Sequence, residues 1–285
     1  MFERIYLEIG NICNLNCSFC AGTTKPKRQM TENEFRLVCQ KIKGHTKFIY
    51  LHVMGEPLLH PKLSAFLQIA NENNLKVCIT TNGLLINKCA QVLLNSPAVY
   101  KISFSIHSLE GNDLSTFENY IENLCNFAKL SAQKGVYNIF RLWNKDSLSG
   151  KGKNANNDKI ENLLHNHFSN EWQVRPKGFR LEKNVFLEYD GVFTWPTKSS
   201  LEECEEGFCY GLVNQLAILV DGTIVPCCLD ANGEISLGNI YSSTLEEVIK
   251  GELSKEIQAG FNSGKIVHSL CKKCSFARKF KKRNN

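Results

Sequence analysis

Short hydrophobic runs alternate along the chain with longer segments in which apolar residues recur at helical spacing. The runs typical of buried strands are Ile5–Ile9, Lys47–Val53, Lys76–Thr80, Lys101–Ile106, Val136–Phe140 and Val185–Glu188. The segments typical of helices lie between them, at residues 32–43, 61–73, 87–95, 117–132 and 157–168. Repeated strand–helix units predict a parallel sheet with right-handed crossovers. Because six such units are too few for an eight-stranded barrel, we expect an α/β fold with a partial (β/α)6 TIM-like barrel.

Local signals refine this outline. Thr31 and Glu34 have the spacing of a capping box, in which each side chain binds the other's backbone N–H, so a helix is expected to begin there. The segment Ser147–Asp158 is rich in Gly, Lys and Asn and predicts a surface loop.

The pattern changes after about residue 190. Leu216–Val220 and Thr223–Pro226 flank the dipeptide Asp221-Gly222, an arrangement typical of a β-hairpin. Two short helices are predicted to follow, at residues 244–250 and 252–261. We therefore expect a core domain over residues 1–185 and a small α+β domain over residues 186–285.

Composition is ordinary for a soluble globular protein, with 43% hydrophobic and 22% charged residues among 285. No apolar run is long enough for a transmembrane helix. The first residues, Met1–Glu8, lack the apolar core and cleavage site of a signal peptide. We expect a cytoplasmic protein that does not engage a membrane.

The cysteines number thirteen, and an odd number in a reducing compartment argues against a disulfide framework, so metal ligation is the better interpretation. The net charge of +6 is local to the end of the chain. Seven basic residues without an acid stand in residues 271–285: Lys272, Lys273, Arg278, Lys279, Lys281, Lys282 and Arg283. Such a tail permits contact with nucleic acid or an acidic partner, although a solvated terminus is the simpler interpretation.

Cys13, Cys17 and Cys20 form a C-x3-C-x2-C run just after the first strand-like segment. Three thiolates held this closely suit three irons of a cubane cluster and leave the fourth iron without a protein ligand. Zinc is the alternative, but a structural zinc site needs a fourth ligand, and none is obvious in this loop.

This spacing, with the aromatic Phe19 beside the last cysteine, resembles the hallmark of the radical S-adenosylmethionine (SAM) superfamily. The resemblance continues in Met54–Pro57, Thr80–Gly83 and Ser105–His107, each at the end of a predicted strand, and in Arg141 at the end of the fifth. It implies that SAM and its [4Fe–4S] cluster bind at this face. The cofactor-binding residues that it implies are Phe19, Gly55, Glu56, Pro57, Thr81, Asn82, Ser105 and Arg141.

Single features have other interpretations. Gly55-Glu56-Pro57 could be an ordinary turn, and His107 is either a structural cap or a catalytic residue. Arg141 suits a carboxylate of SAM or of a substrate, because its guanidinium is bidentate, but could equally pair with a surface acid.

A second group of cysteines near the end of the chain resembles the shortened form, called twitch, of the SPASM domain. The resemblance implies one auxiliary [4Fe–4S] cluster, because no cysteine follows Cys274 as it does in a complete SPASM pattern. Its expected ligands are Cys209, Cys227, Cys271 and Cys274. Cys228 could replace Cys227 as a ligand or act as a catalytic thiol, zinc is an alternative occupant, and the role of Cys204 is open. Cys39, Cys78, Cys89 and Cys125 are expected to be small core residues.

The resemblance implies reductive cleavage of SAM to a 5′-deoxyadenosyl radical, which abstracts a hydrogen from the substrate. A fully ligated auxiliary cluster favours an electron relay and hence a net oxidation, an oxidoreductase activity. The expected partners are a reductant such as flavodoxin or ferredoxin and a substrate that is a small molecule or a peptide. The alternatives are a peptide-modifying maturase or epimerase and a non-catalytic iron–sulfur or zinc protein that binds nucleic acid.

Overall fold

A computed structural model describes residues 1–109, 117–145, 155–191, 195–196 and 204–277. Its strands form one sheet in the order β11-β10-β9-β1-β2-β3-β4-β5-β8-β7-β6. The central strands β1, β2, β3, β4, β5 and β8 run parallel to one another. They span Arg4–Leu7, Phe48–Leu51, Lys76–Thr81, Val99–Phe104, Tyr137–Lys145 and Val185–Gly191. These are the six predicted strands, and the predicted partial barrel is confirmed.

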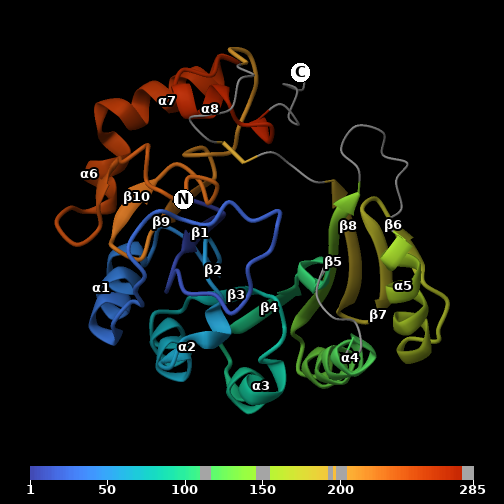
Figure 1. Cartoon of the computed structure of the whole chain (residues 1–285). Helices are drawn as coiled ribbons and strands as arrows, with labels where there is room; N and C mark the ends of the chain where they lie inside the picture. The colour runs from blue at the N-terminus through green and yellow to red at the C-terminus, as the bar shows by residue number, and fades with distance from the viewer. Residues whose placement is uncertain (110–116, 146–154, 192–194, 197–203, 278–285) are drawn as a thin grey trace.

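Five α-helices connect these strands and follow the convex side of the curved sheet (Figure 1). They are α1 (Glu32–Ile42), α2 (Leu63–Glu72), α3 (Ile86–Asn95), α4 (Phe117–Gln133) and α5 (Ala155–His167). The capping box at the start of α1 is present: the Thr31 hydroxyl accepts from Glu34 N, and the Glu34 carboxylate accepts from Thr31 N. Most of the predicted loop Ser147–Asp158 lies outside the described residues, and its last residues begin α5.

Three strand features differ from the prediction. β5 continues to Lys145 and β8 to Gly191, each beyond its predicted end. An antiparallel pair, β6 (Gln173–Arg175) and β7 (Gly178–Glu182), extends the sheet beyond β8. All of β6 is exposed, so its sequence lacks the apolar alternation that reveals a half-buried strand.

The predicted hairpin is present as β9 (Gln215–Ile218) and β10 (Thr223–Val225), joined through Asp221-Gly222. It does not form a sheet of its own: β9 pairs in parallel with β1, and β11 (Gly238–Asn239) pairs with β10. Three helices complete this segment: α6 (Leu245–Lys250), α7 (Glu252–Asn262) and α8 (Ser269–Lys272). The domain boundary between residues 185 and 186 stays a prediction.

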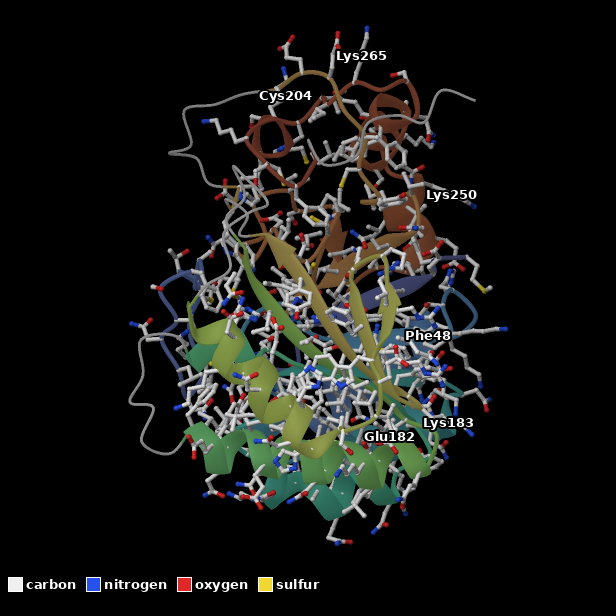
Figure 2. All side chains as sticks on the ribbon, turned by 90° about the vertical axis from the view of Figure 1, so that its right-hand side faces the viewer. Phe48, Glu182, Lys183, Cys204, Lys250 and Lys265 are labelled. Atoms are coloured by element: carbon white, nitrogen blue, oxygen red, sulfur yellow. The ribbon has the colours of Figure 1, made fainter. Side chains whose placement is uncertain are left out.

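The main core lies between the sheet and its helices. Along β1, Ile5 and Leu7 are fully buried toward the helices, whereas Tyr6 points to the inner face of the barrel. Phe35 of α1 stacks on Phe66 of α2 with ring centroids 4.1 Å apart. Figure 2 shows the C-terminal segment above one end of the strands, with Phe48 toward the other end. None of the helices in the described residues is both long and apolar enough to cross a membrane.

Glu8 links the first strand to the C-terminal hairpin. Its buried carboxylate accepts a hydrogen bond from Val220 N through Oε2 (2.9 Å), while Oε1 is buried without a hydrogen-bond partner. Burial raises the pKa of Glu8 to about 7, against which the hydrogen bond from Val220 and the charge of Lys25 act. In the folded chain Glu8 therefore keeps its proton up to about pH 7, whereas in the unfolded chain it releases the proton near pH 4.5.

The contribution of Glu8 to folding stability should fall as the pH rises from about 4.5 to 7, because its carboxyl binds more protons in the folded state than in the unfolded state over this window, whereas the buried His52 and His107 act in the opposite direction. The contribution of Glu8 is at most about 3 kcal/mol. The Glu8→Gln variant should lose this pH dependence in urea unfolding measured at pH 5 and pH 8. The exposed Glu171→Gln should behave as the parent. An unchanged pH slope in Glu8→Gln would contradict a raised pKa.

Candidate functional site

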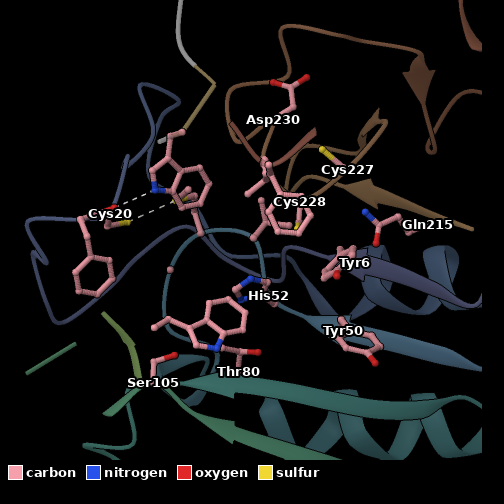
Figure 3. A pocket seen from close by; sticks show the side chains of 18 of the residues that line it. Tyr6, Cys20, Tyr50, His52, Thr80, Ser105, Gln215, Cys227, Cys228 and Asp230 are labelled. Carbon is pink, nitrogen blue, oxygen red and sulfur yellow. Dashed lines mark hydrogen bonds between the residues drawn. The ribbon is translucent and has the colours of Figure 1, made fainter. Parts of the chain in front are cut away.

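One cavity of about 820 Å³ opens at the carboxyl ends of the parallel strands and continues along the inner face of the barrel. Both cysteine groups line it, although they come from opposite ends of the chain. Figure 3 shows Cys20 on one side, Cys227 and Cys228 on another, and Tyr6, Tyr50 and His52 on the barrel wall. Its lining includes Cys13, Cys17, Cys20, Cys209, Cys227, Cys228, Cys271 and Cys274.

The N-terminal cysteines lie in the loop between β1 and α1. Backbone N–H groups point at two of the sulfurs: Leu15 N lies 3.5 Å from Cys13 Sγ, and Gly22 N lies 3.4 Å from Cys20 Sγ. Burial, together with the neighbouring Cys13 and Cys20, raises the pKa of Cys17 to about 11. Three mutually close thiols with N–H donors to sulfur fit a cationic cluster, which would favour the thiolate forms.

Gly55 ties the second strand's loop to the cysteine loop. Its φ is +79°, and an added Cβ would lie 2.3 Å from Gly10 O. The next residue, Glu56, donates its N–H to Ile12 O (2.9 Å), immediately before Cys13. Only glycine permits both this backbone conformation and this approach.

The Glu56 carboxylate joins the same turn to the third strand's loop. Oε1 accepts from Thr81 Oγ1 (2.7 Å) and Leu58 N (3.0 Å), and Oε2 accepts from Asn82 N (2.8 Å). Burial raises the pKa of Glu56, and these three donors oppose that shift. Asn82 in turn donates from Nδ2 to Asn14 Oδ1 (2.9 Å) in the cysteine loop. The side chain of Glu56 therefore positions three loops.

The other residues expected near the cofactor lie around the three loops that Glu56 connects. Pro57 begins the short 3-10 helix η1 (Pro57–Leu59), and Ser105 donates its N–H to Thr81 O (2.8 Å) just before η2 (Ile106–Leu109). Phe19 packs on the ring of His107 with centroids 5.0 Å apart. The structure thus brings Phe19, Ser105 and His107 to one side of the cavity.

His107 is buried and neutral. Its Nδ1 donates to Arg141 O (2.9 Å), which assigns the proton to that nitrogen. Burial, together with the Arg141 charge, lowers the pKa of His107 to about 4, although the hydrogen bond to Arg141 O acts in the opposite direction.

Arg141 lies within β5 and not at its end as predicted, because β5 is longer than the hydrophobic run suggested. Its guanidinium stacks on Trp143, with Cζ 4.5 Å from the ring centroid, and reaches Thr80 Oγ1 at 3.5 Å. It lines the cavity, so the surface ion pair considered for it is wrong.

The C-terminal cysteines gather beyond the hairpin. Burial raises the pKa of Cys227 well above its ordinary value, and the nearby Cys209, Cys228, Cys271 and Cys274 raise it further. Burial also raises the pKa of Cys209 to about 11, although Gly211 N donates to its sulfur (3.4 Å). A set of four neighbouring thiols, one with an N–H donor, fits an auxiliary cubane.

Cys227 and Cys228 point to different surroundings. The charges of Cys209, Cys271 and Cys274 act on the pKa of Cys227, whereas Cys228, which also lies near Cys209, hydrogen-bonds Tyr6 of β1 at the barrel wall. Burial raises the pKa of Cys228 to about 12. Cys204 lies apart, with its sulfur 3.0 Å from Glu206 O and outside the cavity lining.

Neither cysteine group is arranged to hold a single metal ion. Among the described residues, no three Cys, His, Asp or Glu side chains lie close enough together to bind one. The cysteines expected in the core are buried in three cases, Cys39, Cys78 and Cys125, while Cys89 is half-buried.

Sequence reasoning missed several residues of the cavity wall. Tyr6, Tyr50, His52 and Lys101 stand within or directly after predicted strands and were counted only as strand residues. The available signal was their alternation with fully buried positions, as in Tyr6 between Ile5 and Leu7. Polar residues at every second position of a barrel strand indicate a wall that faces a cavity.

Family models match two stretches of the chain. Residues 7–139 match the radical SAM superfamily, and residues 209–275 match the SPASM iron–sulfur cluster-binding domain. Among curated relatives, the antilisterial bacteriocin subtilosin biosynthesis protein AlbA of Bacillus subtilis is 21% identical over 300 residues, which cover 95% of this chain and 64% of AlbA. The chain spans less than two thirds of the length of the curated relatives it matches.

Solved structures share the fold. BtrN in complex with AdoMet and 2-DOIA is 17% identical, with a TM-score of 0.57 over 96% of this chain and 93% of BtrN. Streptococcus suis SuiB bound to its precursor peptide SuiA is 15% identical, with a TM-score of 0.57 over 98% of this chain and 70% of SuiB.

Gly55→Ala should destabilise the protein strongly, because the added methyl group meets Gly10 O in addition to the strained backbone. Gly44→Ala is the matched control, since Gly44 has a φ of +86° but nothing within 4 Å of an added Cβ. We expect a loss of about 1–3 kcal/mol from strain alone at Gly44 and a larger loss at Gly55 in urea unfolding. Equal losses would show that the close approach contributes nothing.

Proposed function

The chain belongs to the radical SAM superfamily and carries a SPASM iron–sulfur domain, and from this we propose that it cleaves SAM and abstracts hydrogen from a substrate in the shared cavity. The observation that carries the proposal is that both cysteine groups line one cavity. A hydrogen-abstracting site and an electron-accepting cluster both need access to one substrate, and one cavity supplies that access.

SAM and the [4Fe–4S] clusters are the cofactors of this family and domain. Cys13, Cys17 and Cys20 would hold the first cluster, and Cys209, Cys227, Cys271 and Cys274 the auxiliary one. When bound, these groups supply the electron that splits SAM into methionine and a 5′-deoxyadenosyl radical, and a route for the electron that an oxidised substrate gives up.

The chain's own residues orient and shield this chemistry. Glu56 fixes the turn that carries Gly55 against the cysteine loop, so that the loop keeps its shape when SAM enters. His107 stays neutral at pH 7 and holds Phe19 through ring contact. Trp195 donates its indole N–H to Phe19 O (2.9 Å) and covers the cavity from the C-terminal side.

The proposed net reaction is an oxidation, with one auxiliary cluster as the electron relay and a flavodoxin or ferredoxin as the source of the reducing electron. Cys227 lies near Cys209, Cys271 and Cys274, which supports it as the fourth ligand. We place the boundary between the radical SAM core and the auxiliary domain between residues 185 and 186. We further propose that the protein is cytoplasmic.

A second candidate is modification of a peptide, by oxidation, crosslinking or epimerisation. It is supported by Cys228, a half-buried thiol that hydrogen-bonds Tyr6 and lines the cavity beside the other cysteines of its group. Such a thiol could return a hydrogen atom to a substrate radical. The similarity to AlbA and to SuiB, whose structure holds a precursor peptide, agrees with this candidate.

Nucleic-acid binding without catalysis is the remaining alternative. The basic tail that suggested it lies mostly outside the described residues, which end at residue 277. Release of 5′-deoxyadenosine from SAM under reducing conditions distinguishes the enzyme from such a binding protein.

Anaerobically reconstituted protein should contain about eight irons and release 5′-deoxyadenosine from SAM, if each cysteine group holds one cubane. Replacing Cys13, Cys17 and Cys20 together by Ala should remove about half of the iron and all SAM cleavage. Iron and zinc analysis with product chromatography measure both. About four irons in the parent protein, or zinc in the C-terminal group, would contradict the two-cluster proposal.

Cys227→Ser should lose the iron of the auxiliary site, whereas Cys228→Ser should keep about eight irons. The reason is that Cys209, Cys271 and Cys274 all lie near Cys227, whereas Cys228 hydrogen-bonds Tyr6 at the barrel wall. Iron content and absorbance of the purified variants report the result. Equal iron loss in both variants would show that Cys228 also contributes a ligand.

Cys271→Ala and Cys274→Ala test whether the auxiliary cluster relays electrons. If it does, substrate-free SAM cleavage persists while oxidised product is lost. A purely structural cluster would instead lower the melting temperature and reduce activity only in proportion to the folded fraction. Full product formation by a soluble variant without this cluster would exclude the relay.

A further inference from the structure

A row of aromatic rings crosses the barrel near the amino ends of its strands. Its four members come from β2, β4, β5 and β8, and we call them the aromatic row: Phe48, Tyr100, Tyr137 and Phe186. The ring centroids of successive members lie 4.9, 5.2 and 6.2 Å apart. Tyr100 and Tyr137 are each 36% exposed, so solvent reaches the middle of the row.

The aromatic row lies on the inner face of the sheet, at the edge of the cavity. Tyr50, Ile139 and Glu188, which line the cavity, each follow a member of the row by two positions. Residues two positions apart on a strand share a face. The remaining member, Tyr100, stands at a shift in register between β3 and β4, and the next residue, Lys101, lines the cavity. The row and the cavity therefore form one continuous inner surface.

The size of the aromatic row suits an extended chain. From β2 to β8 it crosses four strand spacings of about 4.8 Å, or about 19 Å, which equals about six residues of an extended peptide. Exposed groups of large apolar side chains mark binding surfaces more often than bare solvent contact. A small substrate held within the cavity would leave this row uncovered, whereas a longer one would cross it.

The turns that lead into these strands carry an excess of positive charge. Residues 43–48, 73–76, 96–100, 133–137 and 182–186 are all described, and they contain five lysines and one acid, Glu182. The lysines are exposed, and among the described residues none of them forms an ion pair: Lys43, Lys47, Lys76, Lys134 and Lys183. Figure 2 shows Phe48 and Lys183 near one end of the molecule and Lys250 toward the other.

This charge selects the occupant. Two copies of the chain that met through this surface would bring like charges together, whereas an acidic chain would be attracted to it. A single-stranded nucleic acid stacks its bases on open ring faces. Here Tyr100 is tilted by 54° against Phe48 and by 50° against Tyr137 at contact distance, so the rings cover one another's faces. Apolar side chains of a peptide pack on the exposed edges of such rings, so the geometry favours an acidic peptide.

We propose that the aromatic row and the five lysines bind an acidic segment of a peptide substrate, beside the residue that enters the cavity. The inference rests on the peptide-modifying candidate of the proposed function. Side chains alternate along an extended peptide, so apolar residues contact the rings while acids between them reach the lysines at the strand ends.

The experiment measures peptide binding to reconstituted protein saturated with SAM, by calorimetry. The probe is acetyl-Glu-Leu-Glu-Leu-Glu-Leu-amide, and the controls have Gln or Lys in place of Glu. We expect the Glu peptide to bind, its affinity to fall as salt is added, and both controls to bind at least 10-fold more weakly. If the Glu peptide does not bind, binds no better than the Gln peptide, or is insensitive to salt, the proposal is overturned.

Tyr137→Ala locates the binding on the aromatic row. It should weaken binding of the Glu peptide about 2- to 10-fold, the range for loss of an aromatic contact. Substrate-free release of 5′-deoxyadenosine should stay unchanged, because Tyr137 does not line the cavity. Leu130→Ala is the matched control, since Leu130 is 53% exposed on α4 outside the row. Equal affinity of the two variants contradicts the proposal.

Charge reversal decides even if Tyr137→Ala fails to fold, because it changes only exposed side chains. Lys47→Glu combined with Lys183→Glu should weaken binding of the Glu peptide about 10-fold and strengthen binding of the Lys peptide. Lys250→Glu, an exposed lysine toward the other end of the molecule, should leave both affinities unchanged. A double variant that binds both peptides as the parent does overturns the proposal.

Three comparisons separate this surface from its alternatives. Tighter binding of a uridine decamer than of the Glu peptide, lost in Tyr137→Ala, would make the row a nucleic-acid surface and overturn the proposal. Self-association of the parent protein that Tyr137→Ala abolishes would make it a dimer interface with the same consequence. Release of 5′-deoxyadenosine without peptide binding refutes the surface alone, and peptide binding without release refutes the proposed SAM cleavage alone.

Discussion

The site depends on a single buried carboxylate. Glu56 accepts hydrogen bonds from Thr81, Leu58 and Asn82, and its own N–H is donated to Ile12 in the cysteine loop. A charge-assisted bond to a buried carboxylate is stronger than a neutral one, and removal of one partner leaves the others unsatisfied. The loops after β1, β2 and β3 therefore hold one another in place, and the cysteine loop has a rigid base although its thiols are largely exposed.

The hairpin segment is attached to the same loop from the other side. Lys25 pairs with Asp221 at 2.6 Å, and Thr23 and Thr24 both contact the Asn232 side chain. These contacts join the loop that follows Cys20 to the turn between β9 and β10 and to the loop that follows Cys228. Residues about 200 positions apart in sequence thereby enclose the cavity between them.

Sequence reasoning succeeded where structure follows from local pattern. The apolar runs located the six parallel strands, and the Thr31–Glu34 box located the start of α1, because strand burial and helix capping depend on neighbouring residues. It could not find β6, which is exposed, nor the pairing of β9 with β1, which joins distant segments. Of the candidate site, the cysteines and Gly55-Glu56 were visible as motifs, whereas Lys101 was hidden in a strand: its role depends on which face of the strand it occupies.

The pairing of β9 with β1 has a consequence for biosynthesis. β1 leaves the ribosome long before β9, one of its two neighbours, which comes from residues 215–218. Until that segment is made, β1 is an uncovered edge whose N–H and C=O groups can pair with other chains, and contacts of such high sequence separation form slowly. The nascent protein therefore passes through a state in which β1 lacks one neighbour and Cys227, Cys271 and Cys274, which follow β9, have not yet joined the N-terminal cysteines at the cavity.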